Sequence, residues 1–212
     1  MLKIVLDTSI FVNPQSHHLF GKTPQEALSN FLDILKEKKD ISCYFPPSVY
    51  EELMKFMENK LPTEKTVLLH KKPPSSYQSS IPSLFLYEFI EEMRSRVNRG
   101  LRVAEKYTRR GLSISPSREE NLPLNPSSNG IKRKEEEIIK NLRTEFRIGV
   151  REGIIDSKED FDLILLAKEI DAHLATSDNG LIKWAHKLGI TCMSAQELKE
   201  TIHASCLNKD KS

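Results

Sequence analysis

Short apolar segments of strand length alternate with helix-forming patterns at both ends of this chain. Residues 3–6 and 172–176 are two such segments, and helical spacing of apolar side chains occupies residues 24–38 and 181–188. Strands joined by helices form right-handed crossovers, so the pattern predicts an α/β fold with a mainly parallel sheet and helices on both faces. In such sheets, functional sites lie beyond the carboxyl ends of the strands.

A different pattern occupies the middle of the chain. Residues 84–110 and 131–152 have the spacing of long helices, and the segment between them is rich in Pro, Ser and Asn. We therefore predict a helical hairpin over residues 84–152, inserted into a domain formed by residues 1–75 and 153–212.

The first helix of this predicted hairpin carries an apolar stripe with residues spaced three or four apart. A hairpin of two helices cannot bury such a stripe by itself, so we expect the protein to form a homo-oligomer. The stripe consists of Leu86, Ile90, Met93, Val97, Leu101 and Ala104.

Bulk composition excludes some classes of protein. The chain has 32 Lys and Arg against 30 Asp and Glu, so its net charge of +2 does not identify a partner. Three cysteines without C-x-x-C spacing argue against a disulfide framework and a zinc ribbon. No apolar segment approaches the roughly 18 residues of a membrane span. We expect a soluble protein of the reducing cytoplasm.

Aspartates follow the predicted strands at both ends of the chain. Asp7 ends the first strand, and Asp178 comes two residues after the strand 172–176. An isolated buried carboxylate is costly, so Asp7 must be solvated, paired or bound to a cation. Asp156 and Asp160 stand four residues apart and share a helix face if that helix begins at or before Asp156.

Four converging aspartates would provide hard oxygen ligands, which suit magnesium or manganese. The histidines and cysteines have no spacing that indicates zinc. Metal-assisted hydrolysis of a phosphodiester is the chemistry that such a cluster predicts. Glu51 or Glu52 could serve as an auxiliary ligand, and the sequence does not distinguish between them.

Each acid also has a purely structural interpretation. The pair Asp156 and Glu159, or the pair Ser157 and Asp160, could form a capping box at a helix start. Asp178 lies in the segment "SDNG", which is typical of a turn.

Basic residues form a row on the second predicted helix of the hairpin. They are spaced three, four and four apart, so they share one face of a helix that leads toward Asp156. Such a row can bind a nucleic-acid phosphate backbone, although it could also be a solvated face paired with neighbouring glutamates. The row consists of Lys140, Arg143, Arg147 and Arg151.

Taken together, the segments "LDTSIF", "EEL", "DFDLILLAKEIDAHLATSD" and "KLGI" resemble a PIN-domain nuclease. The family's metal-binding acids correspond to Asp7, Asp160 and Asp178. Three further features make the resemblance more specific: the inserted hairpin, the pairing of Asp156 with Asp160, and the basic helix upstream. A PIN domain with these features resembles the compact RNA-free ribonuclease P family, also known as RNA ligase partner proteins.

This resemblance implies a PIN-like fold and endonucleolytic removal of the 5′ leader from precursor tRNA. It implies Asp7, Asp156, Asp160 and Asp178 as catalytic, metal-binding acids, with a water activated by Mg²⁺ or Mn²⁺ as nucleophile. It also implies tRNA contacts from the basic row and a large homo-oligomer built from dimers through the hairpin. Two alternatives stay open: another PIN endoribonuclease of the toxin-like kind, and a non-catalytic RNA-binding partner of an RNA ligase.

Overall fold

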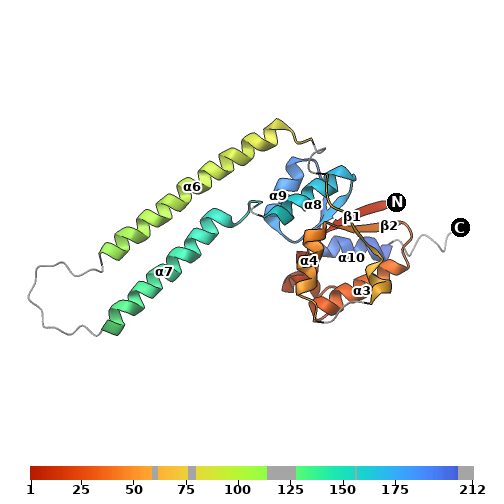
Figure 1. Ribbon diagram of the computed structural model, residues 1–212, viewed down its shortest axis with the longest axis horizontal. Coiled ribbons are helices and arrows are strands. Elements are labelled where there is room, and N and C mark those ends of the chain that lie inside the picture. Colours follow the sequence, from red (N-terminus) through yellow and green to blue (C-terminus); the bar gives the residue numbers. More distant parts are fainter. Residues whose placement is uncertain (59–61, 76–79, 114–127, 156, 205–212) are drawn as a thin grey trace, which may run out of the picture. The chain divides into compact units, whose positions relative to one another are not determined.

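The computed structural model describes residues 1–58, 62–75, 80–113, 128–155 and 157–204 (Figure 1). It divides into two compact units. The sheet unit comprises Met1–Pro82 and Gly153–Ser212, and the hairpin unit comprises Ser83–Glu152. Within the described ranges, no helix combines the length and apolar character that a membrane crossing requires.

A parallel sheet organises the sheet unit. Its strand order is β3-β2-β1-β4-β5, and every described pairing is parallel, which confirms the prediction of a mainly parallel α/β fold. Because β1 pairs with β2 on one side and β4 on the other, the residue after β1 lies at the middle of the carboxyl edge. The strands are β1 (Leu2–Leu6), β2 (Ile41–Phe45), β3 (Leu69–Lys71), β4 (His173–Ala175) and β5 (Cys192–Met193).

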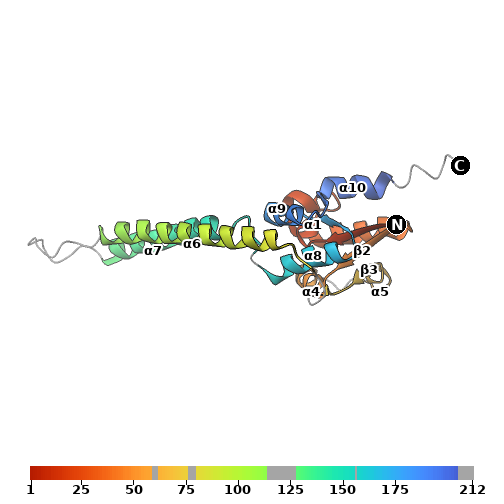
Figure 2. The same ribbon diagram turned by 90° about the horizontal axis from the view of Figure 1, so that it is seen from above.

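Helices cover both faces of this sheet. Figure 2 shows α10 and α4 on opposite sides of it. The apolar faces of the strands and helices meet in a core that includes the fully buried side chains of Leu6, Phe31 and Trp184. The helices are α1 (Ser9–Val12), α2 (Pro14–His17), α3 (Pro24–Lys36), α4 (Pro47–Lys55), α5 (Thr63–Thr66), α8 (Lys158–Glu169), α9 (Asn179–Lys187) and α10 (Ala195–Ala204).

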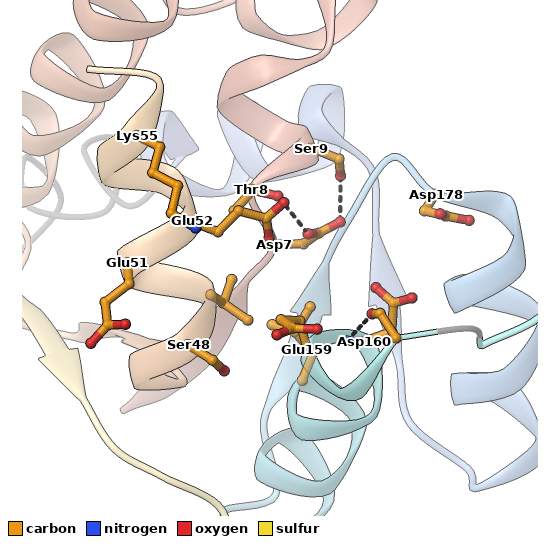
Figure 3. Close-up of a pocket in the computed structure, with 13 residues that line it drawn as sticks. Asp7, Thr8, Ser9, Ser48, Glu51, Glu52, Lys55, Glu159, Asp160 and Asp178 are labelled. Atoms are coloured by element: carbon orange, nitrogen blue, oxygen red, sulfur yellow. Dashed lines mark hydrogen bonds between the residues drawn. The ribbon is translucent and has the colours of Figure 1, made fainter. Parts of the chain in front are cut away.

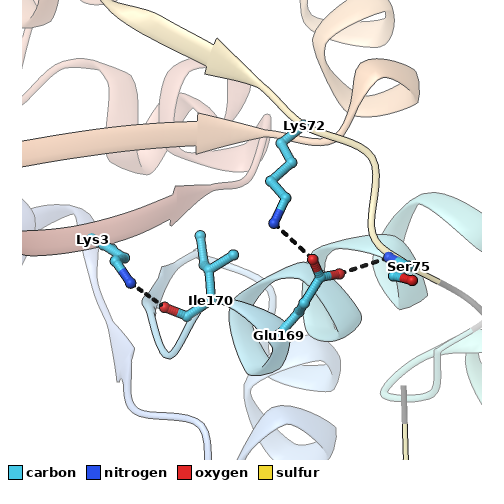
Figure 4. A network of polar contacts seen from close by, with 5 residues as sticks. All are labelled: Lys3, Lys72, Ser75, Glu169 and Ile170. Atoms are coloured by element: carbon cyan, nitrogen blue, oxygen red, sulfur yellow. Dashed lines mark hydrogen bonds and ion pairs between the residues drawn. The ribbon is translucent and has the colours of Figure 1, made fainter. Parts of the chain in front are cut away.

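Polar contacts fix the carboxyl-terminal end of α8 within the sheet unit (Figure 4). Lys3 on β1 donates from Nζ to the carbonyl oxygen of Ile170 at 2.9 Å, where α8 ends. Glu169 accepts from Lys72 at 2.7 Å and from the backbone N–H of Ser75 at 2.6 Å. These contacts hold α8 against β1 and against the segment that follows β3.

The hairpin unit consists of α6 (Ser83–Leu112) and α7 (Ser128–Arg151). Gly100 allows a close approach, because a Cβ at this position would lie 3.0 Å from the ring of Phe146. Arg96 is buried and donates to the backbone oxygens of Val150 and Glu152 at 3.0 and 2.7 Å, next to its ion pair with Glu92. A positive charge at the end of α7 also interacts favourably with the helix dipole.

Five apolar side chains of α6 lie on a face that the hairpin does not cover. They belong to the apolar stripe predicted from the sequence and stay between 41% and 63% exposed. The buried face of α6 uses other residues, including Phe85, Val103 and Tyr107. The exposed set consists of Leu86, Ile90, Met93, Val97 and Leu101.

Candidate active site

A pocket lies at the carboxyl edge of the sheet and is lined by acidic side chains (Figure 3). It has a cavity volume of about 460 Å³, which is within the range of ligand-binding sites. Lys55 is the basic residue among its described lining side chains. The acidic residues come from β1, α4, α8 and the start of α9, and they are Asp7, Glu51, Glu52, Glu159, Asp160 and Asp178.

Asp7 is 7% exposed and accepts hydrogen bonds from hydroxyl groups. Its Oδ2 accepts from Ser9 Oγ and from Thr176 Oγ1 at 2.6 Å, and its Oδ1 accepts from Thr8 Oγ1 at 3.3 Å. The two hydroxyls that follow Asp7 in the sequence therefore solvate its carboxylate. Because these donors are neutral, they place no positive charge beside Asp7 that would compete with a cation.

Asp160 lies in the first turn of α8, where Ser157 Oγ accepts from its backbone N–H at 3.0 Å. The capping interpretation of Ser157 and Asp160 is therefore correct for the backbone, while the Asp160 side chain lines the pocket. Asp156 and Asp160 would share a helix face only if the helix began at or before Asp156, whereas α8 begins at Lys158. Asp156 itself lies outside the described residues.

Asp178 combines a structural role with a place in the pocket. Its Oδ1 accepts from the backbone N–H groups of Gly180 at 2.6 Å and Leu181 at 3.2 Å, which caps α9. A Cβ on Gly180 would lie 2.9 Å from Cα of Gly153, so a glycine is needed where these two segments meet. The start of α9 thus packs against the chain just before Asp156.

The structure distinguishes the two glutamates that the sequence left open. Glu52 is half-buried, whereas Glu51 is exposed. Figure 3 shows the carboxylate of Glu52 close to Asp7. Burial raises the pKa of Glu52, the charges of Asp7 and Glu159 raise it further, and Lys55 partly lowers it. Of the two glutamates, Glu52 is therefore the one whose carboxyl interacts with the negative charge of Asp7.

Sequence reasoning missed three participants in this site. Glu159 was considered only as a cap residue, Lys55 has no neighbouring motif, and Thr176 looks like an ordinary strand residue. The spacing T-x-D before Asp178 was the available signal for Thr176, since strand residues at a carboxyl edge can contact one another.

The donor chemistry of the pocket fits a divalent cation. Its acidic side chains offer carboxylate oxygens, which are the ligands that Mg²⁺ and Mn²⁺ prefer. Among the described residues, no three acidic, histidine or cysteine side chains already stand together as ligands of one ion. Asp7, Asp160 and Asp178 line the same pocket, and they are the described members of the predicted metal-binding set.

The predicted RNA-binding row belongs to α7 in the hairpin unit. All four of its side chains, Lys140, Arg143, Arg147 and Arg151, are exposed. By helical spacing they share the face opposite Leu142 and Glu145, whose side chains are partly covered. Glu145 pairs with Lys106 of α6 at 2.8 Å, so this glutamate is directed away from the row.

The fold and the acidic pocket define a nuclease of the PIN class. A family model described as "PINc domain ribonuclease" matches residues 3–206. The chain is 44% identical over 199 residues to a protein of Thermodesulfovibrio yellowstonii named RNA-free ribonuclease P, covering 93% of this chain and 92% of the relative.

Two archaeal proteins with the same name give similar matches. The protein of Pyrococcus furiosus is 40% identical over 203 residues, covering 95% of this chain and 93% of the relative. The protein of Pyrococcus horikoshii is 42% identical over 204 residues, covering 95% and 92%. The chain belongs to the RNA-free ribonuclease P family of PIN-domain ribonucleases.

The raised pKa of Glu52 predicts a pH-dependent stability. A folded-state pKa above the ordinary value of 4.5 means that ionising Glu52 costs stability as the pH rises through 4.5 and up to the folded-state pKa. In the presence of a chelator at pH 7, Glu52→Gln should therefore melt at a higher temperature than the wild type. The difference should shrink as the pH falls toward 4.5.

Thermal melts of both proteins between pH 4 and pH 8 test this expectation, with Glu51→Gln as the matched control on the exposed neighbour. If Glu51→Gln raised the melting temperature as much as Glu52→Gln, the conclusion that Glu52 is the glutamate close to the aspartates would be contradicted.

Proposed function

We propose that the protein removes the 5′ leader of precursor tRNA as an endonuclease that depends on divalent cations. The observation that carries this proposal is the pocket where β1, α8 and the start of α9 bring Asp7, Asp160 and Asp178 together. Membership of the RNA-free ribonuclease P family supports tRNA as the substrate.

In this proposal Asp7, Asp156, Asp160 and Asp178 are the catalytic acids and hold the cations, which are Mg²⁺ or Mn²⁺. A divalent cation bound there would lower the pKa of a water and neutralise charge on the phosphate. The carboxylates of the chain hold and orient the cations. Neutral hydroxyl donors hold the Asp7 carboxylate in place without a basic side chain beside it. Glu52 and Glu159 add negative charge at the same place.

Replacing Asp160 tests the site. Asp160→Asn keeps the shape of the side chain and removes its charge, so precursor tRNA cleavage in Mg²⁺ should fall by at least about 100-fold. That loss is larger than the 10- to 100-fold effect typical of residues that only orient a ligand. Primer extension or sequencing of the products should map the wild-type cut to the mature 5′ end.

Asp171→Asn is the matched control for this experiment. Asp171 is exposed and has a φ of 51°, a conformation that Asn also tolerates, so this variant should cleave like the wild type. Scattered wild-type cleavage would favour a general PIN endoribonuclease instead. Tight tRNA binding without cleavage would favour a non-catalytic partner of an RNA ligase.

We further propose that the basic row on α7 binds the phosphate backbone of the tRNA. Exposed guanidinium groups in a row can each contact a phosphate by two hydrogen bonds. Such contacts carry affinity and little sequence information, which suits an enzyme that processes many tRNAs. The row is Lys140, Arg143, Arg147 and Arg151.

Salt dependence tests this surface. The double variant Arg143→Ala, Arg147→Ala should weaken binding of different precursor tRNAs by a similar factor. Each lost phosphate contact should reduce the slope of log affinity against log salt by about 1. Filter binding at several salt concentrations measures both quantities. Lys36→Ala on α3 is the control, and an unchanged slope in the double variant would exclude these phosphate contacts.

The exposed apolar stripe of α6 supports a third part of the proposal, which is self-association through the hairpin. Contiguous exposed apolar side chains at helical spacing favour packing against a second helix of the same kind. Dimers formed through α6 and joined into a larger homo-oligomer would bury the stripe, including Val97 and Leu101, which are 63% and 59% exposed in the single chain.

A charge placed in the stripe should prevent this association. Val97→Glu and Leu101→Glu should each shift the protein to smaller species in sedimentation velocity, because burying an unpaired carboxylate costs several kcal/mol. The control Asn98→Glu adds the same charge to an exposed neighbour outside the stripe and should keep the wild-type assembly. Identical sedimentation of all three variants would contradict the proposed interface.

A further inference from the structure

One buried hydroxyl connects two of the proposed metal-binding acids. Thr176 follows β4 and is fully buried. Its Oγ1 donates to Oδ2 of Asp7 at 2.6 Å and accepts from the backbone N–H of Asp178 at 3.0 Å. A hydroxyl has a single hydrogen, so donation to Asp7 leaves the oxygen as the acceptor for Asp178. The direction of both bonds is thereby fixed.

Neighbouring serines strengthen the same connection. Ser9 Oγ donates to Asp7 and accepts from the backbone N–H of Ser177 at 2.9 Å. The hydroxyl of Ser16 on α2 contacts the hydroxyl of Ser177. The segment from Thr176 to Asp178 is therefore held to the amino-terminal part of the sheet unit by side-chain bonds as well as by strand pairing.

The two carboxylate oxygens of Asp7 have different hydrogen-bond donors. Oδ2 accepts the two short hydroxyl bonds, while Oδ1 accepts, among the described residues, the longer bond from Thr8. A carboxylate that is hydrogen-bonded at one oxygen in this way keeps its rotamer although the other acidic side chains of the pocket repel it. The neutral hydroxyl provides this restraint without the charge neutralisation that a Lys or Arg would cause.

We infer that Thr176 is a positioning residue that sets the orientation of Asp7 and its placement relative to Asp178, and thereby the affinity of the pocket for divalent cations. The inference rests on the proposed metal-dependent function. Thr176 does not contact the substrate in this inference. Replacing Thr176 should therefore first change the cation concentration that the enzyme requires.

Removal of the hydroxyl tests this role. Thr176→Val keeps the branched shape and removes both hydrogen bonds, so the half-saturating Mn²⁺ or Mg²⁺ concentration for cleavage should rise by about 10- to 100-fold. Direct titration of Mn²⁺ into the protein, followed by calorimetry, should show the same loss without any substrate present. At saturating cation, kcat should recover toward the wild-type value.

Two further variants separate this role from folding. Thr176→Ser keeps the hydroxyl and should bind Mn²⁺ with nearly wild-type affinity, while Thr176→Ala removes the hydroxyl without the second methyl and should behave like Thr176→Val. Thr201→Val is the control for the loss of a threonine hydroxyl elsewhere, since Thr201 donates to the backbone of Glu197 on α10 at 2.7 Å. Its cation requirement should not change.

Wild-type cation affinity in Thr176→Val or Thr176→Ala, with cleavage still abolished by Asp160→Asn, would overturn the inference and leave the proposed function intact. Equal weakening by Thr176→Ser and Thr176→Val would also overturn it, because the hydroxyl would then not be the cause. If the wild type neither binds Mn²⁺ nor cleaves precursor tRNA, both the inference and the proposed function fail.

Discussion

Repulsion among carboxylates at one end of a parallel sheet is the constraint on which the site depends. Asp7, Glu52, Glu159, Asp160 and Asp178 line one pocket, where Lys55 is the basic side chain among the described lining residues. Burial raises the pKa of Glu52 and the charges of Asp7 and Glu159 raise it further, so ionising this carboxyl costs free energy. Neutral hydroxyl donors, helix caps and the buried core offset this free-energy cost, and a divalent cation would remove the repulsion.

Much of this arrangement follows from local sequence patterns. Alternating strands and helices predict a parallel sheet, and Asp7 and Asp178 stand just after the strands that become neighbours β1 and β4. By contrast, β3 was not predicted, because a three-residue strand at the edge of a sheet depends on pairing with its neighbour more than on its own propensity.

Long-range hydrogen bonds account for what the sequence could not predict. Thr176 and Asp7 are 169 residues apart, and their contact depends on the pairing of β1 with β4. In the hairpin unit, periodicity predicted the apolar stripe and the basic row, because both are properties of a single helix. Periodicity could not predict that Arg96 and Gly100 of α6 would meet α7 while the stripe stays exposed.

The central claim is that the acidic pocket holds divalent cations. The most direct measurement is the anomalous scattering of manganese in crystals grown at Mn²⁺ concentrations that support cleavage of precursor tRNA. The account predicts anomalous peaks within coordination distance of the carboxylate oxygens of Asp7, Asp160 and Asp178. Manganese bound only at other side chains, with this pocket empty under the same conditions, would contradict it.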